Sequence, residues 1–224
     1  ERRHEDYREL RILGLQAQDR DHYMDLDDLF VELDLVPSSI RAEEFGQDPF
    51  AMPRGAESNE PVHLEDALKR VLSLPGLRRG ISITGLPGTG KSTLLKKTWC
   101  EAYHRWQKNQ TMPLPLLIPC ATLQHLGISS LQPGDLRRVV EFLATNDGFR
   151  GLGDIVFQPN AALWVLFDGL DELRSPADRE ALARWLVGES ERWTRFLFVL
   201  TSRPSAWGPR EQRICAPRLV PFEL

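Results

Sequence analysis

A glycine-rich stretch at residues 80–93 limits what this chain can fold into more than any other feature. Its letters are GISITGLPGTGKST, and residues 85–92 match the pattern G-x-x-x-x-G-K-[ST]. Apolar residues typical of a strand precede the pattern, and a helical periodicity follows it. This context is typical of the loop that binds phosphate groups in nucleoside triphosphatases. The alternative interpretation is a glycine-rich turn without a ligand.

The residue types in this loop fit the chemistry of a triphosphate. Gly85, Gly88 and Gly90 would give the backbone φ values closed to other residues, so that N–H groups converge on phosphate oxygens. The Lys91 ammonium could reach the β- and γ-phosphates, and the Ser92 hydroxyl could ligate Mg²⁺. The helix that follows would point its positive end at the anion. We therefore predict nucleotide contacts at Gly85, Pro87, Gly88, Thr89, Gly90, Lys91, Ser92 and Thr93.

Composition and charge describe a globular protein without a predicted membrane span. Of the 224 residues, 42% are hydrophobic and 27% charged, and the net charge of −4 gives no support for a nucleic-acid-binding surface. No run of 18 apolar residues occurs. The three cysteines are widely spaced, which favours buried thiols in a reducing cytoplasm. Because the chain starts without methionine and stops inside an apolar run, we interpret it as a piece of a longer protein.

Apolar runs alternate with helical periodicities after the loop. Buried strands are predicted at 81–84, 114–120, 163–167 and 196–201, with a last strand at 219–224. Helices are predicted at 91–107, 134–145 and 176–187, the last capped by Ser175 and stopped by Gly188. The connections are predicted at 146–160 and 205–217. This alternation predicts an α/β three-layer sandwich, with a central, mostly parallel sheet and helices on both faces.

The segment before the loop divides less clearly. We expect a short helix within residues 1–24 and a half-buried strand at 29–36 that Pro37 closes. A loop or linker at 37–61 then leads into a helix at 62–74, where an apolar face includes Leu64, Ala67, Leu68, Val71 and Leu72. The predicted organisation is therefore an N-terminal helix, strand and linker at 1–61, followed by a nucleotide-binding domain at 62–224.

Two further strand ends carry residues that triphosphate chemistry needs. Ligands of open parallel sheets sit at the carboxyl ends of the strands. Asp168 directly follows a buried strand and could hold Mg²⁺ opposite Ser92. Asp171 or Glu172 could orient the attacking water, and Glu172 is the preferred choice. Taken alone, these residues are a strand end followed by an acidic turn.

The third strand end supplies Ser202 and Arg203, which could donate hydrogen bonds to the γ-phosphate and report its presence. A structural arginine near a helix dipole is the alternative for Arg203. The predicted catalytic residues are Lys91, Asp171, Glu172 and Arg203, and the predicted metal ligands are Ser92 and Asp168. Catalysis would consist mostly of positioning and charge neutralisation.

Three segments resemble the NACHT class of STAND signalling NTPases: the loop at 85–92, LWVLFDGLDEL at 163–173 and FLFVLTSRP at 196–204. The doubled acidic motif D-G-x-D-E is more particular to that class than the phosphate loop is. A strand between the loop and Asp168 in the chain also fits, as do the strand at 29–36 and the helix at 62–74. The resemblance covers about 29–224 and implies a P-loop NTPase of the additional-strand type, similar to AAA+ proteins.

The resemblance also implies a function. Such proteins are held off with ADP, exchange it for ATP when a sensor region detects a trigger, and then form homo-oligomers, in bacterial defence against phage or in animal innate immunity. Helical and winged-helix domains, and effector and sensor regions, would lie outside this chain. Adenine would contact the segment ahead of the loop, near Val62 and His63.

Two other functions stay open at this stage. An AAA+-type motor or loader acting on nucleic acid or protein would share the sheet order, but it needs steady turnover and an arginine finger from a following region. A nucleotide-binding interaction module without catalysis would not need the intact set of Lys91, Ser92, Asp168 and Glu172.

Overall fold

A six-stranded sheet forms the centre of the protein. The structure is a computed structural model, and it describes residues 9–11, 23–25, 33–38, 60–73, 78–146, 152–158 and 160–224. The strand order is β3-β8-β4-β7-β6-β5. In that order the strands are Val36–Pro37, Leu219–Glu223, Gly80–Thr84, Phe196–Ser202, Leu163–Asp168 and Leu114–Pro119. All neighbours pair in parallel except β3, which runs antiparallel to β8 at one edge. The predicted α/β fold with a mostly parallel sheet is confirmed.

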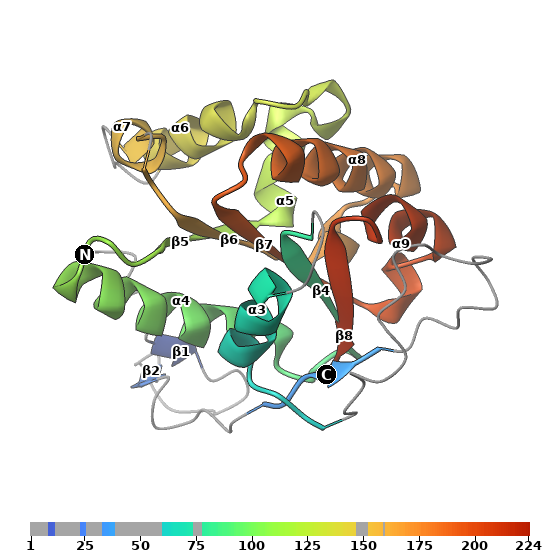
Figure 1. Ribbon diagram of the computed structural model, residues 1–224. Helices are drawn as coiled ribbons and strands as arrows, with labels where there is room; N and C mark the ends of the chain where they lie inside the picture. The colour runs from blue at the N-terminus through green and yellow to red at the C-terminus, as the bar shows by residue number, and fades with distance from the viewer. Residues whose placement is uncertain are drawn as a thin grey trace, which may run out of the picture.

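Helices cover both faces of this sheet (Figure 1). On one face lie α3 (Leu64–Ser73) and α4 (Lys91–Lys108). On the other face lie α5 (Cys120–Leu123), α6 (Leu136–Asn146), α7 (Leu152–Val156), α8 (Pro176–Arg192) and α9 (Pro209–Cys215). The molecule is thus a three-layer sandwich.

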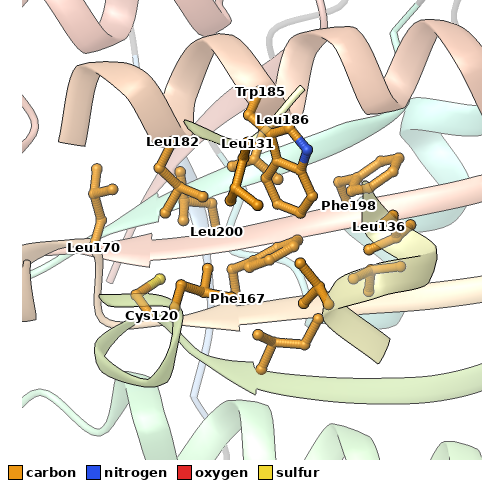
Figure 2. Close-up of a cluster of buried hydrophobic side chains, with 14 of the residues drawn as sticks. Cys120, Leu131, Leu136, Phe167, Leu170, Leu182, Trp185, Leu186, Phe198 and Leu200 are labelled. Carbon is orange, nitrogen blue, oxygen red and sulfur yellow. The ribbon is translucent and has the colours of Figure 1, made fainter. Parts of the chain in front are cut away.

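Alternating side chains of the central strands divide the core in two. In β7, Phe196, Phe198 and Leu200 belong to the core beneath α8, whereas Leu197 and Val199 belong to the core against α3 and α4. Figure 2 shows the first core, where Trp185 of α8 lies over Phe167 of β6, with ring centroids 5.9 Å apart and the rings perpendicular. Because both faces are covered, all seven residues of β7 are buried, and the strand reads as one apolar run in the sequence.

The position of β7 decides the geometry of the site. It lies between β4, which leads into the phosphate loop, and β6, which ends in Asp168. The strand that comes between α4 and β6 in the chain, β5, lies at the edge of the sheet instead. The carboxyl end of β7 therefore lies between the phosphate loop and the acidic turn that follows Asp168.

The N-terminal segment differs from the prediction. Where a helix was expected within 1–24, the described residues form two short antiparallel strands, β1 (Glu9–Arg11) and β2 (Tyr23–Asp25). Sparse apolar residues leave no continuous helical stripe to bury there, so helix formation has no packing to favour it. The first half of the predicted strand at 29–36, residues 29–32, lies outside the described residues.

The described end of that strand is shorter and later than predicted. Leu35 is buried and bridges Val62, but the strand itself is Val36–Pro37. The strand ends at Pro37, as predicted, and Pro37 is its last paired residue, opposite Phe222 of β8. Proline is tolerated here because β3 is an edge strand. The division at residue 61 stays a prediction.

Two individual residues also differ from expectation. Leu72 does not share the buried face of α3, because its side chain is 57% exposed. Gly188 does not stop α8, which continues to Arg192. A Cβ at Gly188 would lie 2.7 Å from Cγ of Pro133, so the glycine permits close packing against the segment before α6. The predicted connection at 146–160 contains the short helix α7, and the one at 205–217, where a loop with one helical turn is expected, contains α9.

A buried carboxylate links α8 to the start of α6. Glu189 is fully buried and accepts hydrogen bonds from the backbone N–H groups of Gly134 and Leu136 and from Nε1 of Trp193. Burial raises the pKa of Glu189, while these three donors act in the opposite direction. The carboxylate thus satisfies N–H groups at the beginning of α6 that the helix itself leaves without acceptors.

Replacing Glu189 with alanine is expected to lower the free energy of unfolding by about 3 kcal/mol, because one buried and two partly buried donors would lose their acceptor. Urea unfolding followed by circular dichroism measures the change. Glu141→Ala is the matched control, since its ion pair with Arg137 is exposed on both sides and its loss should cost less than about 1 kcal/mol. Equal losses in the two variants would contradict the capping role.

Candidate nucleotide-binding site

The phosphate loop connects β4 to α4, as predicted, and two of its three glycines need their special backbone. Gly88 and Gly90 have φ values of 80° and 90°, which side chains rarely allow. Gly85 does not have a positive φ. A Cβ there would lie 2.8 Å from Oγ1 of Thr89, so this position requires glycine for close packing within the loop.

The side chain of Lys91 folds back onto the first residues of the phosphate loop. Its Nζ donates hydrogen bonds to the carbonyl oxygens of Gly85 and Leu86, at 2.6 and 2.9 Å. Burial lowers the pKa of Lys91, while the carboxylates of Asp171 and Asp168 act in the opposite direction. The ammonium therefore lies within the electrostatic reach of the acidic turn, which follows a different strand.

The start of α4 offers donors to an anion. Its N-cap is Gly90, which has no side chain to cap the helix, and the first backbone N–H groups have no acceptor within the helix. Ser92 is exposed and Thr93 half-buried at this end, and Pro87 is exposed in the loop. A lysine, a hydroxyl, free N–H groups and a glycine cradle form a donor set that fits a nucleotide phosphate.

The acidic turn is shaped by Gly169. This residue has φ of 75° and starts the 3₁₀ turn η4 (Leu170–Glu172) after Asp168. A Cβ on Gly169 would lie 2.8 Å from Cδ of Glu172. A larger residue at position 169 would therefore require the Glu172 carboxylate to move. The glycine of the D-G-L-D-E motif therefore lets Glu172 fold back beside Asp168.

The two acids that sequence reasoning left as alternatives have different surroundings. Asp171 is 13% exposed and held by Arg203, whose Nε lies 2.7 Å from Oδ2 and whose backbone N–H donates to Oδ1 at 3.1 Å. Glu172 as a whole residue is exposed but its carboxylate is partly shielded from solvent, and within the described part of the chain no hydrogen bond to that carboxylate is found. Burial, with the charges of Asp168 and Asp171, raises the pKa of Glu172.

Ser202 does not present its hydroxyl to the loop. Its side chain is buried and Oγ donates to the carbonyl oxygen of Arg203 at 3.1 Å. Its own carbonyl oxygen accepts the N–H of Gly85 at 3.3 Å, so Ser202 joins β7 to the phosphate loop through the backbone.

Sequence reasoning missed one residue of this site. Thr201 donates from Oγ1 to Oδ1 of Asp168 at 2.8 Å and is completely buried. Its place directly before Ser202 in the T-S-R-P stretch is the signal that could have drawn attention to it.

A comparison with known protein families identifies the domain that contains these residues. The family profile of the NACHT domain matches residues 79–223. The chain belongs to the NACHT family. It is therefore a nucleotide-binding P-loop NTPase, and the matched region runs from the start of β4 to the end of β8.

Solved structures and curated proteins add little to this NACHT assignment. The structure of C. elegans PCH-2 is 18% identical, with a TM-score of 0.43, over 65% of this chain and 35% of that one. The Aeropyrum pernix ORC2 protein (ADPNP-ADP complexes) is also 18% identical, with a TM-score of 0.43, over 72% of this chain and 45% of that one. The chain thus spans less than half the length of either structure. A search of the curated proteins finds no match.

A cavity of 250 Å³ adjoins the phosphate loop of the NACHT domain on the side of β8. It is lined by Ser38, Thr84, Gly85, Leu86, Pro204, Trp207, Gln212, Pro221, Glu223 and Leu224. Val62 and His63, the expected adenine contacts, are not among these residues. Val62 is buried and bridged to Leu35, and His63 Nδ1 lies 3.4 Å from Oδ1 of Asp34.

Other chemistry at this edge of the NACHT domain has little support. The three cysteines are buried, as predicted, and none of them forms a disulfide within the described residues. Burial, with the nearby charge of Asp168, raises the pKa of the Cys120 thiol, which keeps it neutral and a poor nucleophile. None of the described helices is long and apolar enough to cross a lipid bilayer.

Proposed function

We propose that this NACHT domain is an ATP-binding and slowly hydrolysing switch. One observation supports the proposal: the guanidinium of Arg203, the proposed γ-phosphate sensor, is paired with Asp171 of the acidic turn at 2.7 Å. Lys91 lies in the field of the same acids. A site whose sensing arginine has an internal partner can exist in two states, and that is what a switch requires.

The residues would divide the work as follows. Lys91 and the first N–H groups of α4 bind and orient the phosphates. Ser92 and Asp168 would hold Mg²⁺, which supplies charge neutralisation to the triphosphate. Glu172, for which no ion pair is found among the described residues, would orient the attacking water. The cavity beside Gly85 and Leu86 would accommodate the nucleoside.

Arg203 would act as the sensor. A γ-phosphate carries more negative charge than the carboxylate of Asp171 and would compete with it for the guanidinium, which is about half exposed. With ADP the Asp171 pair persists, and with ATP it is exchanged. The remaining steps of the proposal come from the family resemblance: oligomerisation with ATP, output through effector and sensor regions outside this chain, and a role in immune or anti-phage defence in the cytoplasm.

The nucleotide carried by the purified full-length protein tests the proposal. We expect mass spectrometry to find ADP at close to one molecule per chain in the wild-type protein and none in Lys91→Ala. An empty wild-type site, together with rapid ATP turnover stimulated by DNA or RNA, would contradict the switch and indicate a motor of the AAA+ type. A bound nucleotide that is never hydrolysed would indicate an interaction module.

A further inference from the structure

Thr201 occupies the point where the three strands of the site meet. In β7 it pairs with Ile83 of β4, one residue before the end of that strand. On the other side of β7, Leu200 pairs with Phe167 of β6, so Thr201 lies beside Asp168. The side chain of Thr201 is completely buried. A hydroxyl at this depth must find partners within the protein.

The hydroxyl uses both of its hydrogen-bonding functions on the acidic turn. Oγ1 donates to Oδ1 of Asp168 at 2.8 Å and accepts the backbone N–H of Gly169 at 2.9 Å. The carbonyl oxygen of Phe167, at 3.5 Å, is a much weaker acceptor for the same proton. Thr201 therefore fixes both the side chain of Asp168 and the backbone of the residue that follows it.

The chemistry of these contacts goes beyond satisfying a buried hydroxyl. A threonine in a strand has few allowed χ1 values, so its Oγ1 is a rigid donor. A hydrogen bond to a carboxylate is stronger and more directional than one to a neutral acceptor. With Oδ1 held, the Asp168 carboxylate cannot rotate freely, and its second oxygen is kept in one position.

We propose that Thr201 is a positioning residue for the divalent cation, because it holds the Asp168 carboxylate in the orientation that binds the metal. The inference rests on the proposed role of Asp168 as a metal ligand. The residues that follow Thr201 extend its influence, since Ser202 accepts from the loop at Gly85 and Arg203 holds Asp171. The end of β7 thus connects the metal ligand to the phosphate loop and to the sensing arginine.

The test is the Mg²⁺ dependence of ATP binding by the full-length protein. Binding of a fluorescent ATP analogue is titrated in EDTA and at increasing Mg²⁺ for the wild type, Thr201→Val, Thr201→Ser and Thr98→Val. Valine keeps the shape of threonine but removes the hydroxyl, and serine keeps the hydroxyl. Thr98 is a buried threonine of α4 and serves as the matched control.

We expect Thr201→Val to need roughly 10- to 100-fold more Mg²⁺ for half-maximal stimulation of binding, as is usual when a partner of a metal ligand is removed. Its affinity in EDTA should stay within about threefold of the wild type, and Thr201→Ser and Thr98→Val should behave like the wild type. Unchanged Mg²⁺ dependence in Thr201→Val would overturn the inference. So would an equal loss of affinity with and without Mg²⁺, which indicates a structural role only.

Two further results are distinguishable from these. If Thr201→Val does not fold, Thr201→Ala is measured in the same way, and the same outcomes decide. If the wild type itself binds the ATP analogue without any response to Mg²⁺, the proposed metal role of Asp168 fails, and the inference about Thr201 fails with it. If the wild type responds to Mg²⁺ and Thr201→Val responds in the same way, only the inference about Thr201 fails, and the metal role of Asp168 stands.

Discussion

Glu172→Gln is expected to slow ATP hydrolysis roughly 100- to 1,000-fold while leaving ATP affinity within about threefold. Glutamine keeps the size of the side chain and its place beside Gly169, but it cannot accept a proton from water. The carboxylate of Glu172 accepts no hydrogen bond within the described part of the chain, whereas Asp171 is occupied by two hydrogen-bonding groups of Arg203. Single-turnover hydrolysis of radiolabelled ATP measures the rate, and binding is measured separately with a fluorescent analogue.

Asp171→Asn is the matched control for this experiment. It removes a charge from the neighbouring residue but keeps one oxygen that can accept the Arg203 N–H. We expect a smaller loss in hydrolysis, about tenfold, that comes from a less firmly held Arg203. A greater loss in Asp171→Asn than in Glu172→Gln would contradict the assignment and make Asp171 the residue that orients water.

The raised pKa of Glu172 sets the sign of the pH dependence in the same assay. A general base acts in its deprotonated form, so hydrolysis should decline as the pH falls through the pKa of Glu172. Because burial and the neighbouring carboxylates raise that pKa, the decline should begin at a higher pH than for an ordinary glutamate. The decline should be absent from the residual activity of Glu172→Gln.

Lys91→Ala is expected to weaken ATP binding about 100-fold. Hydrogen bonds to charged groups contribute about 1.5–3 kcal/mol each, and 1.4 kcal/mol corresponds to a tenfold change in affinity. In the structure, Nζ donates hydrogen bonds to the carbonyl oxygens of Gly85 and Leu86, so part of this energy is used to release it. Because these two hydrogen bonds must be given up when Nζ binds phosphate, our estimate of the loss in ATP affinity is at the lower end of what two hydrogen bonds to phosphate could contribute. Titration with a fluorescent ATP analogue measures the affinity.

Lys96→Ala is the control for Lys91, because it removes the same charge from the same helix, five residues further on. Its affinity for ATP should remain within about threefold of the wild type. Thermal unfolding checks that both variants remain folded. Lys91→Ala with wild-type affinity would show that the loop does not bind phosphate through its lysine, and the proposed switch would fail with it.

Much of the site could be predicted from the sequence because its residues lie at places that local patterns identify. Gly85 to Ser92 are contiguous in the chain, Asp168 directly follows an apolar run, and Arg203 follows the strand that ends in Thr201 and Ser202. The carboxyl ends of parallel strands meet at one edge of the sheet, so these residues had to come together. The acidic turn could be located in the same way, but the different surroundings of Asp171 and Glu172 could not.

The limits of prediction are clearest where a residue acts through a distant partner. The helix signals of Ser175 and Pro176 are local, and the structure confirms that Ser175 caps α8. Gly188 looks like a local stop signal, but its role is to admit Pro133 from another segment. The adenine contacts expected near Val62 and His63 stay a prediction; neither residue lines the cavity beside Gly85, and Val62 pairs with Leu35.

The sequence by itself determined the α/β class, the phosphate loop and the identity of the strand-end acids, because periodicity and motif spacing act within a few residues. Only the tertiary structure decided that β7 lies between β4 and β6. That order brings Thr201 to Asp168 and Arg203 to Asp171, a pair 32 residues apart in the chain. Strand order depends on how whole helices and strands pack on one another, and no local pattern of residues encodes it.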